Sequence, residues 1–267
     1  MKKHSLIIFL AALLGLASCK GYNSALKSDN YAEKFEMANT LFEGGDEVRS
    51  IALYEQIYQR MPKTGEGELA YFRIGKAYYV GEDYYMAGYY LGMFSRRFPS
   101  SPKAEETLFL SAMCSVKNSP GVSLDQNETE LAINDLQQFV NRYPNSILID
   151  SCNVTIDRLR FKLETKDFEA VKLYAKTENY RAAVSSAMTF MGDYPASIFK
   201  EDAYFILVKN SYLLSKNSIE SKILERIDQT MERYRTFVAE FPESKYATQV
   251  ANYNDLAAKD KEDYLKK

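Results

Sequence analysis

Apolar and polar positions recur at helical spacing along most of the chain, and the pattern keeps in step with five prolines. Twelve residues before each proline stands a small residue, five before it a large apolar one, and directly before it an aromatic residue or methionine. A small side chain lets a neighbouring helix cross closely, and a large one fills the groove between helices. Proline then ends the helix, because it lacks an N–H group and clashes with the preceding turn. The prolines are Pro62, Pro99, Pro144, Pro195 and Pro242.

The segment around each proline recurs as a unit. Residues 94–101 return as residues 139–146, 190–197 and 237–244, and a weaker copy covers residues 57–64. The second residue after every one of these prolines is serine or threonine, which we expect to cap the next helix. Intervals of 37 to 51 residues between the prolines are close to those of helical repeat arrays.

The pattern predicts an all-α chain of about five αα-hairpins that is similar to the tetratricopeptide repeat, a superhelical fold. The second copy carries this resemblance best, through Tyr71, Ile74, Gly75, Tyr78, Ala87, Leu91, Phe94 and Pro99. We expect N-terminal repeats over about 31–100, C-terminal repeats over about 101–244, and a polar capping helix over about 245–267, since such arrays need a soluble end.

Three later segments depart from a regular repeat. A polar loop covers residues 119–126, and a polar joint covers residues 215–221. Between them we predict an additional amphipathic helix over roughly 147–164, followed by a hairpin at about 167–193.

The first residues read as an export signal with an attachment point for lipid. Lys2 and Lys3 precede an apolar run, Leu6 to Leu14, which is too short to span a bilayer. The following Leu-Ala-Ser-Cys ending at Cys19 resembles the lipobox of bacterial lipoproteins, which implies cleavage before Cys19 and a lipid on its thiol. We therefore expect a signal peptide over 1–18 and a lipidated linker over 19–30. The alternative is an ordinary signal peptide whose cysteine lies near the cut by chance.

Composition argues against catalysis. The only histidine, His4, lies in the predicted signal peptide. Sites built on Ser-His-Asp, Cys-His or His-metal are therefore excluded from the mature chain, and no glycine-rich phosphate loop occurs. A formal net charge of −2 without a basic block gives no footprint for nucleic acid. Carboxylate-only catalysis remains open on composition, but the acidic residues are scattered. We expect no enzyme, no metal and no cofactor beyond the covalent lipid on Cys19.

Two cysteines remain besides Cys19. Cys114 and Cys152 could pair in an oxidising envelope compartment. Alternatively they are buried free thiols, since Cys114 falls at a helical core position and free cysteine packs as a small hydrophobe.

The first helix of each hairpin lines the concave surface in tetratricopeptide proteins, and this resemblance implies a peptide groove on the two best repeats. The apolar rings would form pockets, and a lysine could meet a carboxylate. The alternatives are that this face packs on the linker at 20–30 or is solvated. The candidates are Phe35, Asn39, Phe42, Phe72, Lys76 and Tyr79.

The combination of lipobox, short linker and about five proline-terminated repeats resembles the BamD family of outer-membrane assembly lipoproteins. That resemblance implies a non-enzymatic scaffold, anchored by lipid in the outer membrane and facing the periplasm. Its C-terminal repeats would bind the periplasmic domains of the barrel insertase and accessory lipoproteins. Its N-terminal repeats would receive unfolded outer-membrane proteins by their C-terminal signals.

Two other classes fit part of the pattern. One is another envelope adaptor lipoprotein with tetratricopeptide repeats, which would serve cell-wall synthesis or division. The other is a SusD-like glycan-binding lipoprotein, although that class is usually longer and rich in tryptophan, and this chain has none.

Overall fold

The computed structural model of the protein describes residues 21–266, and every regular element within that range is a helix. Cys19 and the predicted signal peptide lie outside the described residues. The described residues divide into two compact units, residues 21–159 and residues 160–266. No helix within residues 21–266 has both the length and the apolar character needed to cross a membrane.

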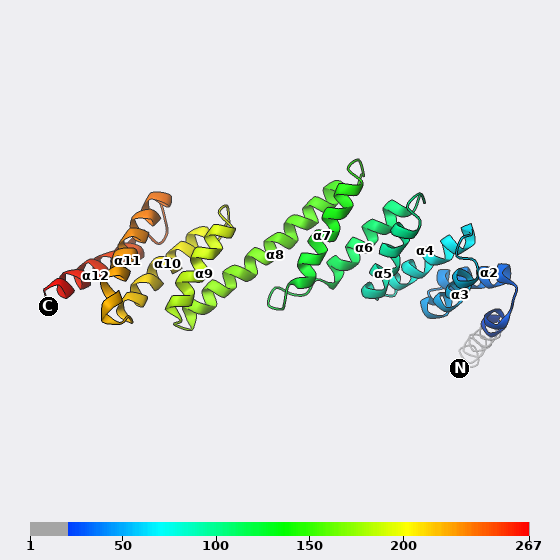
Figure 1. The fold of residues 1–267 in the computed structure, drawn as a ribbon, viewed down its shortest axis with the longest axis horizontal. Coiled ribbons are helices and arrows are strands. Elements are labelled where there is room, and N and C mark those ends of the chain that lie inside the picture. Colours follow the sequence, from blue (N-terminus) through cyan, green and yellow to red (C-terminus); the bar gives the residue numbers. More distant parts are fainter. Residues whose placement is uncertain (1–20, 267) are drawn as a thin grey trace, which may run out of the picture. The chain divides into compact units, whose positions relative to one another are not determined.

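Figure 1 traces the helices in chain order. In the first unit, residues 21–27 are helical. The labelled helices that follow are α2 (Tyr31–Glu43), α3 (Glu47–Arg60), α4 (Gly65–Val80), α5 (Tyr84–Arg97), α6 (Ala104–Asn118), α7 (Asn127–Arg142) and the start of α8 (Ile149–Lys176). The second unit holds the rest of α8 and α9 (Tyr180–Asp193), α10 (Lys200–Lys216), α11 (Glu220–Glu240) and α12 (Ala247–Leu265). The all-α hairpin array is confirmed.

The repeating positions form the core as the pattern predicted. Each large residue five before a proline is at most 2% exposed, and each small residue twelve before is fully buried. Burying a large apolar side chain stabilises the fold by about 1.5–3 kcal/mol, so each repeat contributes a similar amount. The large set is Ile57, Phe94, Phe139, Phe190 and Phe237, and the small set is Ser50, Ala87, Ala132, Ala183 and Thr230.

The helix ends match the prolines, but the predicted serine caps are wrong in most copies. Thr64 caps α4, because its Oγ1 accepts a hydrogen bond from the N–H of Gly67 at 3.1 Å. Ser101 instead accepts from the N–H of Lys103, within the turn before α6. It also donates to Glu68 on the first helix of the preceding hairpin, at 2.6 Å. The hydroxyl therefore ties the turn to the previous repeat and leaves the helix end uncapped.

The same arrangement returns in the second unit. Ser244 accepts from the N–H of Tyr246 and donates to Glu201 at 2.6 Å. Ser197 bonds in the same way to Phe199 and to Glu164. A serine side chain bonds readily to the N–H two residues on, and here that local turn competes successfully with capping.

The predicted separate helix at 147–164 is wrong. A single helix, α8, runs from Ile149 to Lys176 instead. Its sequence contains no glycine or proline that would end it. The turn comes only at residues 177–179, where Glu178 takes a positive φ of 57°.

Part of the predicted linker packs as a helix on the first repeat. Ala25 is 7% exposed and lies in the same core cluster as the apolar residues of α2 and α3. Lys34 of α2 is buried, and its Nζ donates to the carbonyl of Leu26 and to Oε1 of Gln56, at 3.4 and 2.5 Å. An ammonium fits the carbonyl end of a helix, because the backbone dipole is negative there.

Both remaining cysteines are buried free thiols in separate core clusters. Burial raises the pKa of Cys114 to about 12 and also raises the pKa of Cys152. The structure thus favours a packing role over a disulfide.

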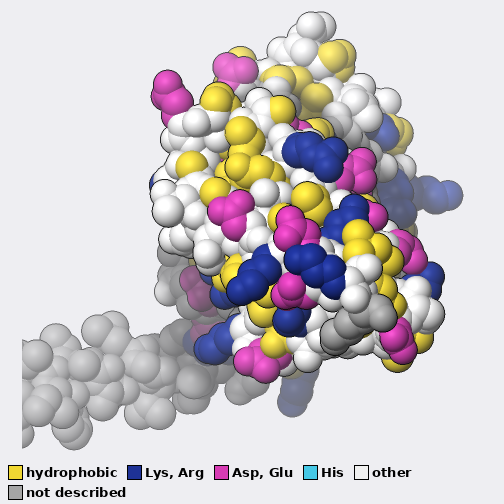
Figure 2. Space-filling view, turned by 90° about the vertical axis from the view of Figure 1, so that its left-hand side faces the viewer, with side chains coloured by type: hydrophobic (Ala, Val, Ile, Leu, Met, Phe, Trp, Pro, Cys, Tyr) yellow, Lys and Arg dark blue, Asp and Glu magenta, His cyan; other side chains and the backbone are white. Residues whose placement is uncertain are grey.

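Surface charges of both signs mix on the molecule. Figure 2 shows basic and acidic side chains interspersed on the face it presents, with hydrophobic side chains between them. In the second unit, Lys261 pairs with Asp228 at 2.7 Å and Lys216 with Asp260 at 3.1 Å. Exposed pairs of this kind add little stability, so their effect is mainly on solubility.

Candidate binding surface on the N-terminal repeats

The three candidates on α2 gather around one buried tyrosine of α3. Tyr54 is fully buried, and its hydroxyl donates to Oδ1 of Asn39 at 2.7 Å. The rings of Phe35 and Phe42 meet Tyr54 edge-on, with centroids 6.0 and 6.5 Å away. Burial raises the pKa of Tyr54 to about 12, so the hydroxyl stays a neutral donor at physiological pH. Contacts with Tyr54 therefore hold Phe35, Asn39 and Phe42 (below, the α2 trio) in place, and all three side chains are half-buried.

Of the candidates on α4, Phe72 lies in the core rather than on a surface. It is 8% exposed and its ring packs edge-on against Phe94, with centroids 5.8 Å apart. The ammonium of Lys103 lies 4.9 Å from the centre of the same ring. Phe72→Ala would thus report on stability and not on binding.

Lys76 and Tyr79 are half-buried and already engaged. Lys76 does meet a carboxylate, but that carboxylate belongs to Glu106 of α6, at 3.1 Å. The ring of Tyr79 packs edge-on against Tyr84, with centroids 5.7 Å apart, and burial raises the pKa of Tyr79. The six candidates therefore do not form one continuous open groove.

The sequence reasoning missed Arg73. Its guanidinium lies 4.9 Å from the centre of the Phe42 ring, which joins α4 to the α2 trio. Its Nε is buried and has no hydrogen-bond partner within the described part of the chain. Leu69, Arg73 and Lys76 have the same i, i+4, i+7 spacing as the predicted trio, so spacing alone could have indicated this face equally well.

The surface can bind a carboxylate together with apolar groups. An arginine recognises a carboxylate through paired N–H groups, and the neighbouring ring of Phe42 offers apolar contact. Within residues 21–266, no group of three histidine, cysteine, aspartate or glutamate side chains is placed to hold a metal ion.

The array of helical hairpins places the protein among the helical repeat proteins. Its family follows from comparison with known proteins. The protein-family model YfiO, whose description is outer membrane lipoprotein, matches residues 27–225 of the sequence. The chain belongs to this family. The resemblance to the BamD family is thereby confirmed.

Individual relatives are distant but cover most of the chain. The outer membrane protein assembly factor BamD of Caulobacter vibrioides is 23% identical over 222 residues, which is 80% of this chain and 72% of that protein. BamD of Neisseria gonorrhoeae is 21% identical over 96% of this chain and 97% of its own length. A solved structure of kinesin light chain TPR-like repeats from Podosopora anserina covers 80% of this chain and 96% of its own, at 13% identity and a TM-score of 0.33. That last likeness is too weak to bear on function.

Proposed function

We propose that this protein is a non-enzymatic assembly factor for outer-membrane β-barrel proteins, anchored by lipid on Cys19 and facing the periplasm. The family match over residues 27–225 carries this proposal, supported by relatives named as outer membrane protein assembly factors. A scaffold of stacked hairpins suits the role, because extended arrays present long binding surfaces.

Within this role, the C-terminal repeats bind the barrel insertase and accessory lipoproteins, and the N-terminal surface receives the C-terminal signals of unfolded barrel proteins. Arg73 supports the second assignment. The guanidinium of Arg73 lies beside the Phe42 ring, and its terminal N–H groups would donate to the carboxylate at the end of a peptide. Arg73 replaces Lys76 as the proposed carboxylate ligand, since Lys76 is paired with Glu106.

Co-purification tests the role itself. The full-length lipoprotein, purified from detergent-solubilised envelopes, should recover the barrel insertase in stoichiometric amounts. A tagged lipoprotein of similar size from the same membrane serves as the control. Recovery of peptidoglycan enzymes would support the adaptor alternative instead, and recovery of a polysaccharide transporter would support the SusD-like alternative.

Arg73→Gln tests the N-terminal surface. We expect it to weaken binding of a barrel C-terminal peptide by about tenfold, which is the equivalent of one strong charge-assisted contact. Lys63→Gln is the matched control, because Lys63 is exposed in the turn before α4. Fluorescence anisotropy measures the affinity, and circular dichroism checks that both variants melt like the parent. Equal affinity in all three proteins would contradict the assignment of Arg73.

A further inference from the structure

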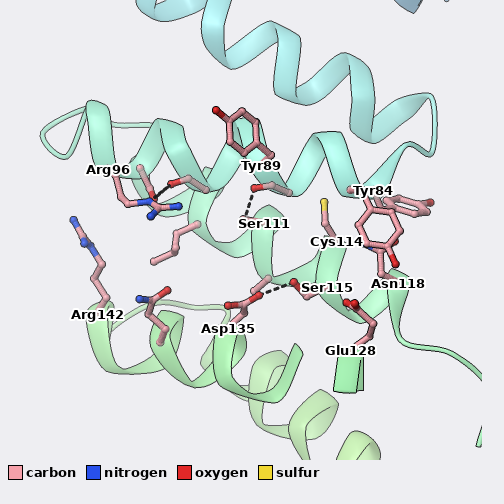
Figure 3. Close-up of a pocket in the computed structure, with 17 residues that line it drawn as sticks. Tyr84, Tyr89, Arg96, Ser111, Cys114, Ser115, Asn118, Glu128, Asp135 and Arg142 are labelled. Carbon is pink, nitrogen blue, oxygen red and sulfur yellow. Dashed lines mark hydrogen bonds between the residues drawn. The ribbon is translucent and has the colours of Figure 1, made fainter. Parts of the chain in front are cut away.

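A hollow lies in the first unit, between α5 and α7 with α6 as its floor. Its volume is about 470 Å³. Figure 3 shows Tyr89 and Arg96 on α5, Ser111 and Ser115 on α6, and Arg142 on α7 around this hollow. We refer to it below as the α5–α7 groove.

Small residues line the floor of this groove, so little side-chain volume fills it. Ser111 donates to the carbonyl of Gly88 at 3.0 Å, which fastens α6 against α5. A Cβ at Gly92 would lie only 2.8 Å from Oγ of Ser111, so a larger residue there would displace this hydroxyl from its bond to Gly88. On the other side, Ser115 donates to Asp135 of α7 at 2.5 Å. The groove is thus held by contacts on both walls.

The α5–α7 groove is separate from the surface that carries Arg73 and Lys76. Lys76 contacts α6 through Glu106. At the helical rotation of 100° per residue, Ser111 and Ser115 point about 140° and 180° away from Glu106 around α6. The two surfaces therefore lie on opposite sides of α6, and both can be occupied at once.

Two arginines stand at one end of the groove without an anionic partner. Figure 3 places Arg96 and Arg142 together at that end and Glu128 at the other. Both arginines are exposed, and neither forms an ion pair within the part of the chain that the structure describes. Arg96 uses only its Nε, toward the carbonyl of Gly92 at 3.3 Å. By contrast, the adjacent Arg97 donates to the hydroxyl of Tyr58.

Two exposed tyrosines lie on the same wall of the groove as Arg96, farther along α5. Tyr85 is 66% exposed and Tyr89 is 57% exposed. Tyr85, Tyr89 and Arg96 follow one face of α5, at intervals of four and seven residues. Tyrosine rings offer an apolar body with a polar tip and often serve as binding contacts.

We propose that the α5–α7 groove binds an extended acidic segment of a protein partner. An aspartate or glutamate side chain of the segment lies between Arg96 and Arg142, and its apolar or aromatic residues pack on Tyr85 and Tyr89. The eleven-residue interval from Tyr85 to Arg96 spans about 16 Å of helix, which matches about five residues of extended chain. We assign the carboxylate to a side chain of the segment, and the test below distinguishes it from a carboxylate at a chain terminus.

This inference goes beyond the proposed function and does not depend on it. It assigns the first unit two sites of different chemistry, so that it can hold two segments at the same time.

The test uses a fluorescein-labelled heptapeptide with two phenylalanines followed by two aspartates and an amidated C-terminus. Binding to the full-length protein in detergent is measured by fluorescence anisotropy. We expect Arg96→Gln/Arg142→Gln to weaken binding about tenfold or more, because two charge-assisted contacts are lost. Arg60→Gln is the matched control, since Arg60 is exposed two residues before Pro62, as Arg142 is before Pro144, and does not line the groove. It should leave the affinity unchanged.

Two further sets of measurements test whether the carboxylate must come from a side chain of the peptide and whether the peptide binds in the α5–α7 groove. A peptide in which asparagines replace both aspartates, with the C-terminus still amidated, should not bind. The same asparagine peptide with a free C-terminal carboxylate should not bind either. Arg73→Gln should leave the affinity for the aspartate peptide unchanged. Unchanged binding in the Arg96/Arg142 double variant would overturn the proposal. Loss of binding in Arg73→Gln, equal binding of either asparagine peptide, or no binding at millimolar concentration would overturn it as well.

Discussion

Gly67→Ala should destabilise the N-terminal repeats by about 3 kcal/mol or more, at the upper end of the cost of overpacking a core. Gly67 is buried near the start of α4, where the end of α3 comes closest. An added Cβ would lie 1.8 Å from the carbonyl oxygen of Met61 and 2.7 Å from its carbonyl carbon. These are backbone atoms, so no side-chain rotation relieves the overlap.

The oxygen of Met61 cannot simply move aside. It accepts hydrogen bonds from both the N–H and the hydroxyl of Thr64, at 3.2 and 3.1 Å, and these bonds close the turn between α3 and α4. Thr64 in turn caps α4 through the N–H of Gly67. Relieving the overlap would therefore break the turn and the cap together.

Gly65→Ala provides the matched control in the same helical turn. A Cβ at Gly65 meets nothing within 4 Å. Alanine there should be neutral or stabilise the fold by about 0.5–1 kcal/mol, since glycine costs more conformational entropy in a helix. Urea denaturation followed by circular dichroism measures both variants, and hydrogen exchange of α3 and α4 locates the change. If the two variants proved equally stable, the close approach at Gly67 would be refuted.

Cys19→Ser should move the protein from the membrane to the soluble fraction. A serine hydroxyl cannot take the place of the cysteine thiol that is proposed to carry the lipid. Each buried methylene contributes about 0.8 kcal/mol, so the loss of one long acyl chain already removes about 10 kcal/mol of membrane partitioning. Among residues 21–266, no helix is long and apolar enough to cross the bilayer in place of the lipid.

Fractionation of envelopes in high salt measures this effect, and the urea transition of the released protein should match that of the parent. Cys152→Ala is the control, because its thiol is buried in the core and its loss should leave membrane attachment intact. A Cys19→Ser protein that stayed in the outer-membrane fraction would contradict the lipid anchor.

Much of the fold follows from local patterns. Proline positions predicted where helices end, because proline acts on the turn before it. The small and large positions before the prolines predicted the core, because they recur at the same places in every repeat and so pack in the same way. Phe94 and Ala87, for instance, are fully buried as expected. The predicted helix end at about residue 164 was wrong, because α8 contains no glycine or proline that would end it and continues to Lys176.

The binding surface was predicted less well, since it depends on which neighbours cover each helix face. The faces of α4 that contain Phe72 and Arg73 are only about 100° apart, and both have helical spacing. Phe94 and Lys103 pack on Phe72, which is buried, whereas Arg73 on the next face is half-buried. Likewise, nothing in the local sequence indicates that Lys76 pairs with Glu106, thirty residues away.

The sequence by itself determined the helices, their ends and the repeating core, because periodicity and proline act within a single element. Only the tertiary structure decided which charges are left without partners. Arg73 meets the ring of Phe42 on another helix, and Arg96 and Arg142 come from two different helices to the same end of the α5–α7 groove. Such contacts form only when the hairpins stack, and they therefore leave no mark in the pattern of apolar and polar positions along the chain.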